Sequence, residues 1–154
     1  MNDFLARLQN GGLLFDGSMG ALIEARGVTT NCPALLNAEN PALIRAIHQD
    51  YRAAGADVSI ANTFGANPIK LRALGLENRL DELIEKGVAL AREAGNFALL
   101  DIGPTGEFLR PAGNIGLEEM VQVLRACGQA GARAGADGVI IETKAGAGEC
   151  RAAA

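Results

Sequence analysis

A short cassette that occurs twice constrains the fold of this chain more than any other feature. Ala-Gly-Ala-Asp at 54–57 leads into the apolar run 58–61 and then Asn62-Thr63, and Ala-Gly-Ala-Asp at 134–137 leads into 138–141 and then Glu142-Thr143. The copies begin at positions 54 and 134, 80 residues apart, which leaves room for two strand and helix units of about 40 residues each. The strands that follow the two copies are therefore expected to be equivalent parts of one repeating architecture.

Short apolar runs alternate with helical periodicity along the rest of the chain. Strands are expected at 13–15, 58–61, 97–100 and 139–141, and helices from Asn40 to Gly55, Leu80 to Gly95, Leu117 to Gly135 and from Glu149 onward. This order implies a parallel sheet with helical crossovers. A doubly wound open sheet alternates in the same way, but near-equal repetition favours a barrel. We therefore expect an α/β fold containing the first four βα units of a (β/α)8 TIM barrel, incomplete because such barrels need about 200–250 residues or more.

Charge and composition limit the classes of partner. The net charge of -4 is spread without a basic block, which argues against a nucleic-acid partner, and no apolar stretch has the length of a membrane span. Cys32, Cys127 and Cys150 lie far apart without a paired motif, as expected for free thiols in a reducing compartment. We expect a cytoplasmic protein that binds a small molecule.

Polar residues follow the expected strands, where the functional groups of parallel barrels project. They are Asp16, Asn62 with Thr63, Asp101, and Glu142 with Thr143. Carboxylates and neutral hydrogen-bonding groups around one opening suit an ammonium ligand, because ammonium offers a charge and three donors. An acid and base pair, or simple capping of the next turn, are the alternatives for these residues.

Three other features have a functional and a structural interpretation. The glycines at 17 and 20 follow the first expected strand, where backbone N–H groups could converge on a carboxylate or merely form a tight turn. Lys144 could form a Schiff base or be a solvated loop residue. His48, the only histidine, is expected on a helix surface, and the three cysteines are not expected to bind a metal.

Five motifs occur together in an order typical of one family. They are 15–20 (Phe-Asp-Gly-Ser-Met-Gly), 36–41 (Leu-Asn to Asn-Pro), 54–64 (Ala-Gly-Ala-Asp to Asn-Thr-Phe), 103–106 (Gly-Pro-Thr-Gly) and 141–143 (Ile-Glu-Thr). Together they resemble the homocysteine-binding barrel of the homocysteine S-methyltransferase family, which includes cobalamin-dependent methionine synthase and betaine-homocysteine methyltransferases. The resemblance runs from about residue 12 to the end. It implies that residues 1–154 are the amino-terminal half of this barrel domain.

The resemblance implies an enzyme that transfers a methyl group to the thiol of homocysteine and forms methionine. Position by position, Asp16 and Glu142 would hold the substrate ammonium. Gly17 and Ser18 would offer backbone donors to its carboxylate, and Thr63 would line the same pocket. In this family a zinc ion binds the substrate sulfur through cysteines beyond residue 154, so this chain alone is expected to lack the zinc ligands and could be inactive.

The resemblance leaves the methyl donor and the partners open. The loop at 103–106 favours methylcobalamin, with a corrinoid protein or domain as partner, over betaine or S-methylmethionine. Two alternative functions remain: a non-catalytic half-barrel that binds an amino acid or acts as an assembly unit, and an aldolase-like barrel using Lys144. Because an incomplete barrel has unpaired edges, we also expect self-association or poor stability of the isolated chain.

Overall fold

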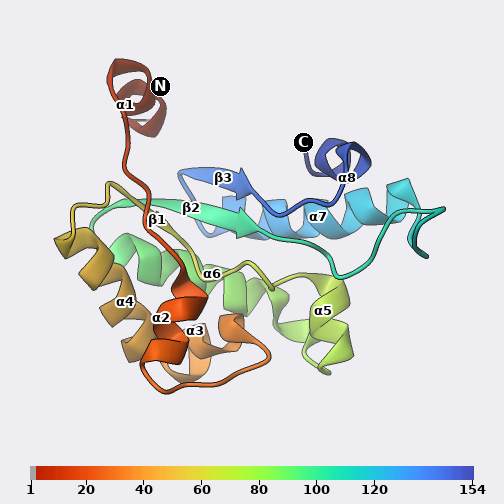
Figure 1. Ribbon diagram of the computed structural model, residues 1–154, viewed down its shortest axis with the longest axis horizontal. Helices are drawn as coiled ribbons and strands as arrows, with labels where there is room; N and C mark the ends of the chain where they lie inside the picture. Colours follow the sequence, from red (N-terminus) through yellow and green to blue (C-terminus); the bar gives the residue numbers. More distant parts are fainter. Residues whose placement is uncertain (1–2) are drawn as a thin grey trace.

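The computed structural model describes residues 3–154, in which helices alternate with parallel strands (Figure 1). The strands are β1 (Val58–Ile60), β2 (Phe97–Ile102) and β3 (Gly138–Ile141). The α-helices are α1 (Asp3–Asn10), α2 (Met19–Ala25), α3 (Leu36–Glu39), α4 (Pro41–Ala53), α5 (Pro68–Ala73), α6 (Leu80–Glu93), α7 (Leu117–Arg133) and α8 (Ala147–Ala153), and the 3-10 helices are η1 (Pro33–Leu35) and η2 (Glu77–Arg79).

The three strands form one parallel sheet in the order β1-β2-β3. Val58 lies opposite Phe97 in the first pair, and Leu99 lies opposite Gly138 in the second. The expected α/β class with parallel strands is confirmed. The two strands that follow the repeated cassette, β1 and β3, lie on either side of β2.

The stretch 13–15, expected to be the first strand, makes only a single parallel bridge, from Phe15 to Val58. Val58 N–H donates to Leu14 O at 3.1 Å and Asp16 N–H donates to Val58 O at 3.0 Å. At the next position the Asp16 carboxylate, rather than a main-chain carbonyl, accepts from Ile60 N–H at 3.0 Å. The ladder ends there, so the segment lies beside β1 without forming a strand of the sheet.

The four helices predicted from periodicity are present as α4, α6, α7 and α8. In α4 the Asn40 side chain accepts from Leu43 N–H at 3.3 Å, Pro41 is the first helical residue, and Gly55 follows the helix with a φ of 104°. The short helices α2 and α5 were not predicted, because seven and six residues carry too little periodicity to recognise. No helix among residues 3–154 is long and apolar enough to cross a membrane.

Helices α4, α6 and α7 cover one face of the sheet (Figure 1). The main core lies between this face and the helices, and includes Leu100 of β2 and the fully buried Ile84 and Val88 of α6. On the opposite face, Phe4 of α1 packs on Leu99. β3 is an edge strand whose Val139 and Ile141 side chains remain 50% and 39% exposed.

Candidate functional site

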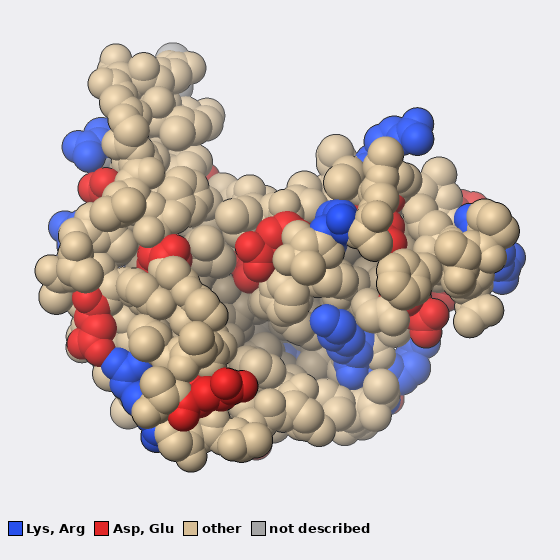
Figure 2. All heavy atoms as spheres, viewed as in Figure 1, with Lys and Arg blue, Asp and Glu red and all other residues tan. Residues whose placement is uncertain are grey.

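A cavity of about 520 Å³ lies at the carboxyl-terminal ends of the strands. Its wall contains three carboxylates, from the segment after residue 15, from β2 and from the end of β3. In Figure 2 acidic side chains gather near the centre of the view, over the ends of the β2 and β3 arrows of Figure 1. The lining residues are Asp16, Gly17, Ser18, Met19, Gly20, Pro33, Ile60, Ala61, Asn62, Phe64, Asp101 and Glu142.

Asp16 is held by the sheet. Both of its carboxylate oxygens accept from Ile60 N–H, at 3.1 and 3.0 Å, and its side chain is only 2% exposed. An ionised carboxylate has about four acceptor positions, so one N–H donor leaves capacity for a ligand. Asp16 is therefore oriented before any ligand arrives.

His48 corrects an expectation from the sequence, because it is fully buried and not on the helix surface. Its Nδ1 lies 3.6 Å from Asp16 Oδ2, and neither ring nitrogen has a hydrogen-bond partner within the described part of the chain. Periodicity had placed His48 beside the apolar stripe of α4. The segment carrying Asp16 packs over that side of the helix, which brings the imidazole behind the carboxylate.

Asp101 lies inside β2, one residue before the last residue of the strand, Ile102. Its side chain lines the cavity, the residue is 7% exposed, and Oδ1 has no hydrogen-bond partner among residues 3–154. Burial raises the pKa of Asp101 to about 7, and the negative charge of Glu142 acts in the same direction. This carboxyl group is thus poised to change its protonation near neutral pH.

Thr63, predicted to line the pocket, lies beneath it and is 1% exposed. Its hydroxyl accepts from Asp101 N–H and donates to Asp101 O, both at 3.0 Å. The side chain therefore continues the pairing of β1 with β2 after the main-chain ladder ends, and fixes the backbone of Asp101.

The end of β3 places Glu142 at the cavity and Lys144 beside it. Thr143, between them, has a φ of 56°, a conformation uncommon for a residue other than glycine. Lys144 Nζ donates to Gly103 O at 2.6 Å, and partial burial lowers the pKa of this lysine. Lys144 is therefore neither a lining residue nor a fully solvated loop lysine: it ties the loop after β3 to the loop after β2.

Two close contacts shape the wall of the cavity. A Cβ on Gly103 would lie 2.5 Å from Phe64 O, so only glycine lets the loops after β1 and β2 approach this closely. Asn62 donates to Asn37 Oδ1 at 2.9 Å and to Pro33 O at 2.8 Å, and thereby joins the end of β1 to η1 and α3. These contacts hold Asn62 and Phe64, which line the cavity, in place.

Gly17 and Ser18 lie where the chain enters α2. The Ser18 hydroxyl accepts from Ala21 N–H at 3.2 Å and caps this helix, while Tyr51 donates to Ser18 O at 3.2 Å. A Cβ on Gly17 would lie 2.8 Å from the Tyr51 hydroxyl oxygen, so glycine permits this contact.

The structure thus brings Asp16, Gly17, Ser18 and Glu142 to one cavity and leaves Thr63 under it. The sequence placed Asp101 among the polar residues at the strand ends, but the family resemblance gave it no role in the site, and the structure shows that it lines the cavity. Successive side chains of a strand point to opposite faces of the sheet. Because Leu100 faces the helices, this alternation could have placed Asp101 on the other face of the sheet.

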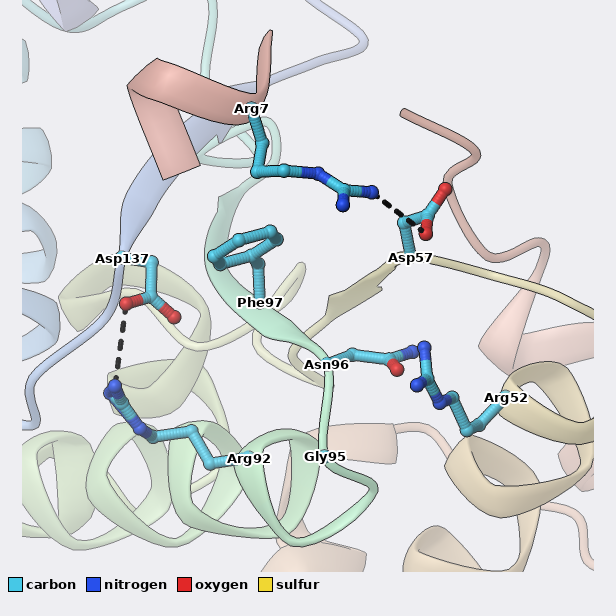
Figure 3. Close-up of a pocket in the computed structure, with 8 residues that line it drawn as sticks. All are labelled: Arg7, Arg52, Asp57, Arg92, Gly95, Asn96, Phe97 and Asp137. Atoms are coloured by element: carbon cyan, nitrogen blue, oxygen red, sulfur yellow. Dashed lines mark hydrogen bonds and ion pairs between the residues drawn. The ribbon is translucent and has the colours of Figure 1, made fainter. Parts of the chain in front are cut away.

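A second cavity, of about 410 Å³, lies at the amino-terminal ends of the strands (Figure 3). Here the aspartates of the repeated cassette have equivalent partners. Asp57 Oδ2 accepts from Leu14 N–H at 3.1 Å, and Asp137 Oδ2 accepts from Ala98 N–H at 2.9 Å. Asp57 therefore joins the start of β1 to the segment 13–15, and Asp137 joins the start of β3 to β2.

Arginines complete this second cavity. Arg7 lies 3.7 Å from Asp57 and Arg92 lies 3.3 Å from Asp137 (Figure 3). Arg52 donates to Ala56 O at 3.2 Å. Since residues at this end of parallel barrel strands generally serve stability, we assign the amino-terminal cavity a structural role.

No group of three or more His, Cys, Asp or Glu side chains within residues 3–154 is placed to hold a metal ion. Cys32 and Cys127 are buried and Cys150 is exposed, each as a free thiol. Burial raises the pKa of Cys127 to about 12, which disfavours its thiolate.

A family profile described as Homocysteine S-methyltransferase matches residues 13–154. Among curated proteins, the chain is 40% identical over 108 residues to the homocysteine S-methyltransferase of Escherichia coli (strain K12), a match covering 68% of this chain and 34% of the relative. It is 33% identical over 101 residues to methionine synthase of Mycobacterium tuberculosis, covering 61% of this chain and 8% of the relative.

The solved structures give the same result. The oxidized form of the homocysteine methyltransferase MmuM from Escherichia coli superposes with a TM-score of 0.86 at 31% identity, over 99% of this chain and 60% of that chain. The metallated form superposes with a TM-score of 0.84 over 98% of this chain. The chain thus spans less than two thirds of the length of these relatives.

Proposed function

Because this chain belongs to the homocysteine S-methyltransferase family, we propose that it is the amino-terminal half of a (β/α)8 barrel domain that methylates homocysteine. The observation that carries the proposal is the cavity at the carboxyl-terminal ends of the strands, where Asp16, Asp101 and Glu142 meet. An opening lined by carboxylates suits the ammonium end of an amino acid.

Asp16 and Glu142 hold the ammonium group in this proposal. The two bonds from Ile60 N–H to Asp16 fix its carboxylate, so little conformational freedom is lost on binding. Gly17 and Ser18 offer backbone N–H groups to the substrate carboxylate from the same wall. Thr63 supports the pocket through its two hydrogen bonds to the Asp101 backbone.

The thiol must lose its proton before it attacks a methyl group, since the thiolate is the nucleophile. A zinc ion, which the family resemblance implies, supplies that activation when bound. The side chains of residues 3–154 do not form a site for it. We therefore assign this part of the domain the binding and orientation of the amino-acid end, and derive no step through the metal.

We propose methylcobalamin, delivered by a corrinoid protein or domain, as the methyl donor. The support is the loop at 103–106 and the similarity to methionine synthase of Mycobacterium tuberculosis. Self-association is proposed on separate grounds, because Val139 and Ile141 leave apolar surface on the edge strand. A single monomeric species by light scattering, with a cooperative thermal transition, would contradict the association.

Calorimetric titration of the chain with homocysteine, with and without zinc, tests the binding proposal. We expect saturable binding of one homocysteine per chain in both conditions, because the amino-acid contacts do not depend on the metal. Absence of binding in both would overturn the proposal. A parallel assay of methyl transfer separates the enzyme from the non-catalytic half-barrel: turnover eliminates the half-barrel, and binding without turnover supports it.

A further inference from the structure

Asp101 has a buried polar atom for which residues 3–154 supply no hydrogen-bond partner. It is 7% exposed, its side chain lines the cavity, and Oδ1 accepts no hydrogen bond from the described residues. A buried, unsatisfied carboxyl oxygen costs free energy, so native proteins rarely retain one without a reason. The cavity in front of it is where a donor could arrive.

The charges around Asp101 are mainly negative. Glu142, at the end of β3, and Asp16, beside β1, both act to raise the pKa of Asp101, whereas Lys144 acts to lower it. The Lys144 ammonium is already engaged, since it donates to a backbone carbonyl of the loop after β2. The buried imidazole of His48 faces Asp16. A cation entering the cavity would therefore meet three acidic side chains and no free positive charge on the lining residues.

We propose that Asp101 is a third carboxyl group of the amino-acid site, which binds the substrate ammonium through Oδ1 and releases its own proton to solvent when it does so. This inference rests on the proposed function and extends it to a proton-linked step. The balance is simple: the Asp101 O–H bond breaks, the proton goes to water or buffer, and the ammonium keeps its three protons.

The physical basis is the change of environment on binding. Burial and the neighbouring carboxylates raise the pKa of Asp101 to about 7 in the free protein, so about half of the molecules hold the proton at pH 7. An ammonium within hydrogen-bond distance favours the ionised form and lowers this pKa again. Binding at pH 7 should then release about 0.5 proton per chain.

The test is calorimetry of homocysteine binding to the zinc-free chain at pH 7 in buffers of different ionisation enthalpy. We expect release of about 0.5 proton by the unchanged protein and almost none by Asp101→Asn. The variant should also bind homocysteine about tenfold more weakly at pH 8, where Asp101 is largely ionised. Binding of 4-mercaptobutyrate, which lacks the amino group, should be equal for both proteins.

The possible outcomes distinguish the role of Asp101 from the proposed function. If the unchanged protein binds homocysteine without releasing a proton, or if Asp101→Asn binds and releases like the unchanged protein, the role of Asp101 is wrong and the proposed function stands. If the variant weakens 4-mercaptobutyrate as much as homocysteine, the effect is general damage to the pocket and the inference is wrong. If the unchanged protein does not bind homocysteine, both are wrong.

Discussion

Aspartates at the two ends of the sheet have opposite surroundings. At the amino-terminal end, Asp137 accepts from the Ala98 N–H and pairs with Arg92. At the carboxyl-terminal end, Asp101 is buried beside Glu142 and leaves Oδ1 without a partner among the described residues. The same side chain thus stabilises the fold at one end and costs stability at the other, as expected if only the second end must bind a ligand.

Glu142→Gln should distinguish the two ends of the sheet most clearly, because it should change ligand affinity with little change in stability. Removing this charge should lower homocysteine affinity about 100-fold, because the substrate ammonium loses a charged partner in a partly buried site. The urea midpoint should change little. The matched control is Glu118→Gln on the exposed start of α7, which should leave affinity unchanged. Equal affinities for Glu142→Gln and the control would remove Glu142 from the site.

Asp137→Ala should have the reverse pattern. The Ala98 N–H loses its acceptor and Arg92 loses its ion pair, so the free energy of unfolding should fall by about 1–3 kcal/mol. Homocysteine affinity, measured where the protein remains folded, should change less than about twofold. Urea unfolding measures the first quantity, and a loss below about 0.5 kcal/mol would show that the amino-terminal contacts do not stabilise the sheet.

Asp101→Asn should change the pH dependence of stability. The pKa of Asp101 is raised from 3.8 to about 7, so the native chain keeps a proton that the unfolded chain loses in this range. The contribution is fully present below pH 3.8 and is lost as the pH rises to about 7. Between pH 5 and 8 the unchanged protein should lose about 2–3 kcal/mol relative to the variant. If the free energies of unfolding of the two proteins, measured in urea, changed with pH in the same way, the raised pKa of Asp101 would be contradicted.

Asp81→Asn gives the smallest expected effect and tests the contribution of an aspartate–arginine ion pair alone. Asp81 pairs with Arg133 at 2.8 Å, like Asp137 with Arg92, but both side chains are largely exposed. Its loss should cost less than about 0.5 kcal/mol. A cost as large as that of Asp137→Ala would mean that the arginine, and not the strand N–H, accounts for the amino-terminal stabilisation.

Sequence periodicity predicted the long helices and the order of the strands, because these depend on local apolar spacing. It did not predict that the stretch 13–15 fails to form a strand, since this depends on the Asp16 side chain accepting from Ile60 across the sheet. The burial of His48 was missed for a related reason. Helical spacing gives a side chain's direction, whereas burial depends on which segment packs there.

The candidate site was predicted in outline and differed in detail. The pattern of apolar strands placed Asp16 and Glu142 at the strand ends, the resemblance implied their role as ammonium ligands, and both line the cavity. β2 was expected to end at residue 100 but extends to Ile102, so Asp101 lies within the strand and not in the following loop. Strand ends are set by pairing with neighbours, here with β3, and this cannot be read from one segment alone.

If ligand binds only at the carboxyl-terminal ends of the strands, backbone amide chemical shifts followed by NMR during addition of homocysteine give the most direct test. We expect the changes to cluster at 16–20, 62–64, 101–103 and 142–144, with little change at 57, 96 and 137. Changes centred on the amino-terminal cavity, or no saturable change at the carboxyl-terminal ends of the strands, would contradict this expectation.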